Sequence, residues 1–451
     1  MSATVLSLRG HARAMLLLSV PLVGSHLAHA LIGLTDTVML GWYSIDALAA
    51  GALANSFFFT LFVVGSGFSH AVMPMVASAA SADNPTQVRR VTRMGLWLSV
   101  IAGTALMPIM WWSAPILRLL GQNPEIADLA QVYLRIAGWG MFPALLVMVL
   151  KSYLAALERA QVIFWVTVVG GVGNAAGNWL LIFGNWGFPE LGIAGAGIAT
   201  LLNHCLMLLG LCLFIRRKLP QYVLFQRLWR SDWEAFRAVY KLGWPIGLTH
   251  LAESGLFTAT ALMVGWIGTQ QLAAHGIAMQ ITSTMFMVHI GLSQAATVRA
   301  GRAFGRDDVP NLLRGGKVAI LCSLLMIGLT MLLFLGLPGP LIGLFLSPEE
   351  PQAQAIIRIG IGLMAVAALF QLADGMQVMA MGLLRGVQDT RTPMIHAVVS
   401  YWALGMPAGY LLGFWTPLAE IGVWLGLVVG LFCAAILLQH RFWVRRRWMA
   451  D

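Results

Sequence analysis

The stretch MLGWYSIDALAA, from Met39 to Ala50, returns 224 positions later as MVGWIGTQQLAA, from Met263 to Ala274. Similarity at one fixed offset indicates a structural unit that the chain uses twice. The chain therefore consists of two similar halves, and we expect both halves to adopt the same fold.

The composition places this repeated unit in a membrane. Of the 451 residues, 59% are hydrophobic and only 10% are charged, whereas soluble proteins carry about 25% charged residues. Apolar runs at least as long as the roughly 20 residues that cross a bilayer recur along the chain. They are far longer than the ~10 alternating residues of a barrel strand. We expect an all-α integral membrane protein with twelve transmembrane helices.

Six expected helices fall in each half. They cover residues 14–41, 47–80, 91–113, 126–155, 160–183, 192–215, 239–266, 273–304, 315–337, 355–384, 393–415 and 421–443. We expect an N-lobe of residues 1–215, a cytoplasmic inter-lobe loop of residues 216–238 and a C-lobe of residues 239–451. Because six is an even number, both lobes start on the same side, and a pseudo-two-fold axis along the membrane normal should relate them.

The distribution of charge predicts the orientation in the membrane. The formal net charge of +10 would also suit a nucleic-acid-binding protein, but most Lys and Arg fall on the side that holds both termini. Basic segments such as Arg216-Arg217-Lys218 follow the positive-inside rule. We expect cytoplasmic termini, a location in the cell (inner or plasma) membrane, membrane lipids as neighbours and no nucleic-acid partner.

One proline lies inside the first expected helix of each half. Pro21 and Pro245 align at the offset of the repeat. A proline removes a backbone hydrogen bond and clashes with the preceding turn, although membrane helices often tolerate it. The matched positions favour a role for both prolines as hinges.

Three acids, Asp36, Glu253 and Asp374, lie within apolar runs. A charge at the bilayer centre costs at least about 2.5–3.5 kcal/mol, so such acids usually face the bundle interior and have a function. A protonated acid can instead join helices. Because low dielectric disfavours the bare carboxylate and a cation restores it, each acid can exchange a proton, a sodium ion and a cationic substrate. The repeat pairs Glu253 with His29 and Asp36 with Thr260, so we infer that the halves do different jobs.

Polar side chains accompany these acids. Asn174 and Asn178, four residues apart, share one face of the fifth expected helix, and Thr200 lies on the sixth. Their oxygens can complete a sodium site around Asp36, although Asn and Thr also commonly bond across membrane helices. Near the other two acids the chain places Gln371, Gln377 and His250.

At these residues the chain resembles the multidrug and toxic compound extrusion (MATE) family, and within it the NorM-type branch. The resemblance covers nearly the whole chain. It is carried by Pro21 with Asp36, by LAESGLF around Glu253, by GLSQAATVRAGRAFGRDD from Gly291, and by QLADGMQVMAMGLLRGVQDTRTPM from Gln371.

The resemblance implies a bilobed exporter that expels cationic, lipophilic drugs in exchange for sodium ions or protons, with no cofactor besides the coupling ion. It implies an ion site in the N-lobe, made by Asp36, Asn174, Asn178 and Thr200. It also implies an ion or substrate site in the C-lobe, made by Glu253 and Asp374. Sodium would be held at the three acids. Phe370 departs from the branch, in which a tyrosine can stand one turn before the last acid.

Other functions compete with this interpretation. A flippase of a related fold for lipids or polysaccharide precursors would need a strongly basic cavity, whereas the expected helix interiors carry acids. An enzyme would need a nucleophile, base or metal cluster, and the chain has no Gly-rich phosphate loop or HExxH motif, so we expect no enzymatic activity. Duplicated halves with asymmetric acids suit alternating access better than a channel. We expect a monomer that binds small cationic molecules.

Overall fold

The computed structural model describes residues 7–346 and 351–445. Within these residues every regular element is a helix and no strand occurs. The first six residues of the predicted N-lobe, the last six of the predicted C-lobe and residues 347–350 lie outside the described residues.

The first half of the chain contains the helices α1 to α8. They are α1 (Leu8–Tyr43), α2 (Ile45–Ser81), α3 (Pro85–Trp111), α4 (Ser113–Leu119), α5 (Pro124–Ala137), α6 (Met141–Ala156), α7 (Ala160–Leu181) and α8 (Gly192–Lys218), with the 3-10 turns η1 (Gly138–Gly140), η2 (Asn185–Gly187) and η3 (Pro220–Tyr222). Helices α5 and α6, joined by η1, form one candidate membrane span.

The second half contains the helices α9 to α16. They are α9 (Trp233–Ile267), α10 (Thr269–Phe304), α11 (Val309–Gly336), α12 (Pro338–Gly343), α13 (Ala353–Gly386), α14 (Arg391–Val399), α15 (Met406–Phe414) and α16 (Ala419–His440), with the π-helical turns η4 (Ser400–Gly405) and η5 (Arg441–Arg445). The turn η4 joins α14 and α15 into one candidate span.

Ten stretches of the described chain are long and apolar enough to cross a membrane. Helices α9 and α10, with 35 and 36 residues, also exceed the ~20 residues that a span requires, although neither is among those ten stretches. These twelve segments correspond one to one with the predicted helices, six in each half. The expected all-α membrane protein with twelve transmembrane helices in two six-helix lobes is confirmed, whereas the axis that relates the lobes stays a prediction.

Several helices begin earlier than their apolar runs. Helix α3 begins at Pro85 rather than at residue 91, and α11 begins at Val309 rather than at 315. Before each helix a side chain, Asn84 or Asp308, accepts a hydrogen bond from the backbone N–H three residues later, at 2.9 and 3.1 Å. Such caps stabilise a polar first turn. Apolar runs therefore mark the part of a helix within the bilayer and miss its capped end.

The contacts divide the chain into two compact units, Gly24–Gly247 and Met1–Val23 with Leu248–Asp451. Both boundaries fall inside the first helix of a half, in α1 and in α9. Each of these helices therefore runs from one unit into the other. The predicted lobe limits at residues 215 and 239 describe the halves of the sequence and stay a prediction.

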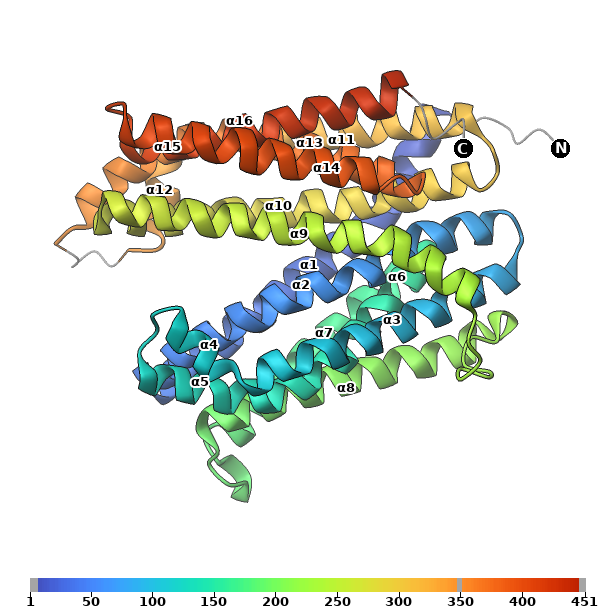
Figure 1. Cartoon of the computed structure of the whole chain (residues 1–451), viewed down its shortest axis with the longest axis horizontal. Helices are drawn as coiled ribbons and strands as arrows, with labels where there is room; N and C mark the ends of the chain where they lie inside the picture. The colour runs from blue at the N-terminus through green and yellow to red at the C-terminus, as the bar shows by residue number, and fades with distance from the viewer. Residues whose placement is uncertain (1–6, 347–350, 446–451) are drawn as a thin grey trace. The chain divides into compact units, whose positions relative to one another are not determined.

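Each unit is a bundle of long helices. In Gly24–Gly247, α2 packs along α3 and α6, and α7 packs along α8; in the other unit, α10 and α16 pack on α13 (Figure 1). Helices α15 and α16 meet through glycines, since a Cβ atom on Gly426 would lie 2.2 Å from the Cα atom of Gly409. Close backbone approach at small residues is typical of membrane helices. These bundles hold the polar side chains described below.

Candidate functional site

The first cluster of polar side chains lies in the unit Gly24–Gly247. Asp36 on α1 is half-buried, and Asn174 and Asn178 on α7 are buried. Asn178 Nδ2 donates a hydrogen bond to Asp36 Oδ1 at 2.5 Å and lies 3.4 Å from Asn174 Oδ1. The four-residue spacing gives both amides the same helix face. The structure thus brings together Asp36, Asn174 and Asn178, three of the four residues of the predicted N-lobe ion site.

Thr200, the fourth predicted residue, joins this cluster through a residue that the sequence did not reveal. Tyr133 on α5 is buried, and its hydroxyl lies 3.4 Å from Thr200 Oγ1. The phenol also interacts electrostatically with Asp36. No motif marks Tyr133, because α5 contributes it from a different part of the chain. We define the first cluster as Asp36, Asn174, Asn178, Thr200 and Tyr133.

Two amide atoms of the first cluster have no hydrogen-bond partner although they are buried: Asn174 Nδ2 and Asn178 Oδ1. An unpartnered polar atom away from water costs about 1–3 kcal/mol. A hard cation such as sodium prefers oxygen ligands. The Asn178 oxygen and the Asp36 carboxylate, on adjacent side chains, can supply such ligands.

The second cluster lies in the other unit. Glu253 on α9 and Asp374 on α13 interact electrostatically as like charges. The Asp374 side chain is buried, whereas the Glu253 side chain is 15% exposed. One oxygen of each, Glu253 Oε1 and Asp374 Oδ1, is buried without a hydrogen-bond partner. Because two neighbouring carboxylates cannot both stay charged cheaply, this pair is suited to bind one positive partner.

A histidine and an arginine form a chain of contacts that starts at Glu253. His250 Nδ1 lies 3.8 Å from Glu253 Oε2, and Arg385 Nη2 lies 3.4 Å from His250 Nε2. Glu253 is therefore connected through His250 to the last turn of α13, where Arg385 lies.

The glutamines on either side of Asp374 have different surroundings. Gln371 donates from Nε2 to the Thr282 carbonyl oxygen at 3.1 Å and so joins α13 to α10. Gln377 is buried and its Oε1 atom has no hydrogen-bond partner. Phe370 packs edge-on against Phe257 and Trp424. It contributes a ring to the packing and no ligand oxygen.

Tyr401 is the second residue that the sequence did not reveal. It is fully buried on the π-helical turn η4, and its phenol interacts with the Gln377 side chain and electrostatically with Glu253 and Asp374. The next residue, Trp402, donates from Nε1 to the Ala252 carbonyl oxygen at 3.2 Å, which joins the turn to α9. We define the second cluster as Glu253, Asp374, Gln377 and Tyr401.

The two predicted hinge prolines lie inside continuous helices, Pro21 in α1 and Pro245 in α9. Each lies two residues before a boundary between the compact units, which fall after Val23 and Gly247. The prolines and the unit boundaries thus follow the same 224-residue offset as the repeat.

Twelve long helices with a buried acidic cluster in each half are typical of secondary transporters. The chain belongs to the MatE family, whose family model matches residues 21–180 and 245–411. The two matched segments start at Pro21 and Pro245, as the repeat requires. The resemblance to MATE transporters is thereby confirmed.

Individual relatives agree with this assignment. The chain is 45% identical over 437 residues to the probable multidrug resistance protein NorM of Rhizobium meliloti, covering 96% of this chain and 93% of that protein. It is 42% identical over 436 residues to the NorM of Agrobacterium fabrum, with the same coverage. The crystal structure of the eukaryotic MATE transporter AtDTX14 shares the fold, with a TM-score of 0.88 and 17% identity, covering 98% of this chain and 97% of that one.

Proposed function

We propose that this protein is an antiporter that exports cationic, lipophilic small molecules in exchange for a cation, sodium or proton, by alternating access. The observation that carries the proposal is the pair of acidic clusters on the long apolar helices, each with at least one buried oxygen atom that has no hydrogen-bond partner. Membership of the MatE family and the multidrug resistance proteins among its relatives support it.

Exchange follows from the electrostatics of the clusters. A carboxylate in a medium of low dielectric is stable only beside a positive or hydrogen-bonding partner. Asp36 has one such donor in Asn178, and the pair Glu253 and Asp374 carries two negative charges when both are ionised. A coupling cation and a cationic drug that compete for these charges cannot both be held. Entry of one therefore favours release of the other.

The acids of the two clusters also argue against a flippase for lipid or polysaccharide precursors, because the anionic cargo of such a flippase needs basic partners.

Under the proposal the protein lies in the plasma or inner membrane with both termini in the cytoplasm. It acts as a monomer among lipids, binds small cationic molecules and needs no cofactor or enzymatic step. Asp36, Asn174, Asn178 and Thr200 hold the ion in the N-lobe, and Glu253 and Asp374 hold ion or substrate in the C-lobe.

The proposal is tested with the purified full-length chain in liposomes that contain a fluorescent lipophilic cation. Sodium and pH gradients are imposed separately, so that the coupling ion is identified. We expect the rate of gradient-driven dye movement to fall about tenfold or more in Asp36→Asn, Glu253→Gln and Asp374→Asn. Each variant removes a charge that binds the cation or the dye, and a rise of roughly 1.4 kcal/mol in the activation free energy of transport corresponds to a tenfold slower rate. Asp46→Asn, an exposed acid in the first turn of α2, serves as the control. Dye movement without any gradient, or full coupling in all three variants, contradicts the proposal.

A further inference from the structure

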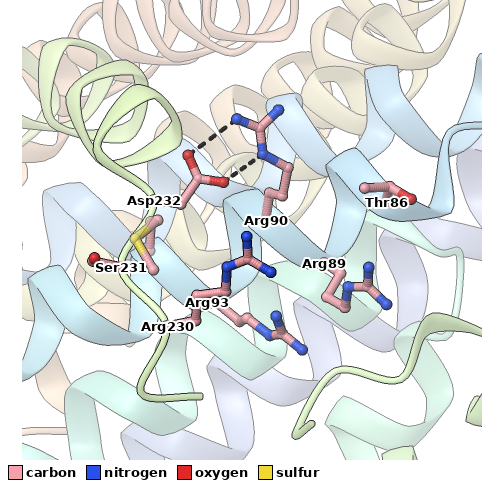
Figure 2. A pocket seen from close by; sticks show the side chains of 8 residues that line it. Thr86, Arg89, Arg90, Arg93, Arg230, Ser231 and Asp232 are labelled. Carbon is pink, nitrogen blue, oxygen red and sulfur yellow. Dashed lines mark hydrogen bonds and ion pairs between the residues drawn. The ribbon is translucent and has the colours of Figure 1, made fainter. Parts of the chain in front are cut away.

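A basic cavity lies in the unit Gly24–Gly247, and none of its lining residues belongs to either acidic cluster. It encloses about 420 Å³ between the first turns of α3 and the segment that leads into α9. Figure 2 shows the guanidinium groups that gather there. The lining residues are Thr86, Arg89, Arg90, Arg93, Met94, Arg230, Ser231 and Asp232.

Two of the arginines hold the segment that forms one wall of the cavity. Arg93 donates to the backbone carbonyl oxygens of Val223 and Leu224, at 3.3 and 3.0 Å, and also to that of Gln226. Arg90 donates from Nε and Nη2 to the two carboxylate oxygens of Asp232, at 2.5 and 3.0 Å (Figure 2). The loop of residues 223–232 that forms this wall is therefore held by hydrogen bonds at both of its ends.

The positive charge of the cavity exceeds its negative charge. Arg90 is compensated by Asp232 and by Glu234, which accepts from Arg90 Nη2 at 2.6 Å. The partners of Arg93 are uncharged carbonyls. Among the described residues neither Arg89 nor Arg230 forms an ion pair, and both act on Arg93 as like charges.

Arg89 also has an unsatisfied donor. Its Nε atom is buried and has no hydrogen-bond partner. Thr86 and Ser231 add hydroxyl groups to the same wall. Guanidinium groups match phosphate oxygens with paired hydrogen bonds, and basic pockets beside membrane helices on the cytoplasmic side bind anionic lipid headgroups. The predicted topology places this segment on that side.

We propose that this cavity binds a phosphate group through Arg89 and Arg230, with Arg90 and Arg93 holding the loop in place. The phosphate can belong to the headgroup of an anionic phospholipid or be free in the cytoplasm, since both present the same oxygens. Binding here requires neither acidic cluster, so the inference stands apart from the transport function.

The test uses the full-length chain in nanodiscs of phosphatidylcholine, with and without phosphatidylglycerol, and in phosphatidylcholine with inorganic phosphate. Native mass spectrometry counts retained phosphatidylglycerol, and thermal unfolding reports stabilisation by either phosphate source. The variant Arg89→Gln/Arg230→Gln leaves the loop contacts of Arg90 and Arg93 intact. Arg216→Gln/Arg217→Gln removes the same charge from the exposed last turn of α8 and is the matched control.

We expect at least one phosphate source to bind the wild type and the control, and to bind the Arg89→Gln/Arg230→Gln variant about tenfold or more weakly, because hydrogen bonds to charged groups are strong. Binding of phosphatidylglycerol alone identifies the lipid, and binding of inorganic phosphate alone identifies the free ion. Equal losses in both double variants, or no loss in either, overturn the proposal. The single variant Arg230→Gln changes an exposed loop side chain and should also bind more weakly than the control, which keeps the proposal testable if the double variant fails to fold.

Discussion

At the scale of single residues, the carboxyl groups of Asp36 and Asp374 differ in the neighbours that stabilise them in a buried position. Asp36 accepts a short hydrogen bond from Asn178, so part of its charge is stabilised by a neutral neighbour. Asp374 lies beside a second acid and keeps an oxygen without a partner. The second cluster therefore depends more strongly on an added positive charge than the first.

The phenol of Tyr401 is expected to contribute to that dependence. Replacing Tyr401 by Phe removes only the hydroxyl, which is buried beside Gln377 and electrostatically coupled to Glu253 and Asp374. If the hydroxyl is a ligand, the affinity for the coupling cation should fall about tenfold, because one such contact contributes roughly 1.5 kcal/mol. Titration of tryptophan fluorescence with sodium at several pH values measures the affinity, since Trp402 is adjacent in sequence.

Tyr410→Phe is the matched control for this measurement. Tyr410 lies on α15, is 46% exposed and contacts Phe414 through its ring, so its hydroxyl should not matter. Unchanged cation affinity in Tyr401→Phe, combined with lost affinity in Asp374→Asn, would show that the carboxylates bind the cation without the phenol.

The sequence predicted the site residues that share one face of a helix. It did not predict the site residues that tertiary packing brings in from other helices. Asn174 and Asn178 were expected together because residues four apart share a helix face. Tyr133 and Tyr401 approach from other helices, and no local pattern places them near the acids. Tyr401 also lies in a π-helical turn, which shifts the positions of side chains around the helix in a way that hydropathy does not reveal.

At the scale of elements, α15 and the preceding turn η4 pack closely on α16 because a glycine recurs every four residues on both sides of the contact. Gly405, Gly409 and Gly413 face Gly422, Gly426 and Gly430, and the nearest atoms to several of the missing Cβ positions belong to the opposite backbone. This contact supports α16, which packs against α13, the helix that carries Asp374.

Gly426→Ala should therefore destabilise the protein by about 1–3 kcal/mol, the usual cost of overpacking. Its Cβ atom would lie 2.2 Å from Gly409 Cα, and a backbone cannot rotate away as a side chain can. Gly328→Ala on α11 is the control, because nothing lies within 4 Å of its Cβ position. Thermal unfolding in detergent measures both; equal melting temperatures for the two variants would contradict the argument.

The segment before α9 offers a prediction about pH. Hydrogen bonds from Arg90 lower the pKa of the Asp232 carboxyl below its ordinary value. The Arg90–Asp232 pair therefore contributes stability above the unfolded-state pKa of about 3.9, and that contribution is lost as the pH falls through the lower folded-state pKa. The partly exposed pair should contribute about 1 kcal/mol.

At neutral pH, Asp232→Asn should raise amide hydrogen exchange of residues 223–230 about fivefold, the factor that 1 kcal/mol predicts. The wild type should approach the variant only as the pH falls below the unfolded-state carboxyl pKa and through the lower folded-state pKa of Asp232, after correction for intrinsic exchange rates. Asp83→Asn, an exposed acid in the turn before α3, is the control. Identical exchange in wild type and Asp232→Asn at neutral pH would exclude a tethering role for the ion pair.

Helix number was readable from the sequence because twelve apolar runs follow directly from the thickness of the bilayer. Helix ends were less readable, since caps such as Asn84 and Asp308 extend helices beyond the apolar run. The short helices α4 and α12 and the turn η4 were not predicted, because their residues lack a periodicity of their own.

At the scale of the whole molecule, the repeat of the sequence reappears in the division of the chain into units. Pro21 and Pro245 each precede a unit boundary by two residues, inside helices that run from one unit into the other. A proline deletes one backbone hydrogen bond and weakens the helix locally. In α1 and α9 a missing backbone hydrogen bond thus lies within two residues of the boundary between the units.

If these prolines are hinges, replacing them by alanine should slow transport while leaving ligand binding intact. Pro21→Ala and Pro245→Ala each restore a backbone N–H, so the helix becomes stiffer at the boundary and the conformational step becomes slower, by about tenfold if it limits turnover. Pro108→Ala on α3, an exposed proline with no counterpart in the repeat, should transport normally. Dye efflux and cation affinity, measured on the same preparations, separate the two effects. Wild-type efflux in both variants would mean that transport does not require bending of α1 and α9 at these prolines. A parallel loss of cation affinity would mean that the prolines position the residues of the clusters and do not act as hinges.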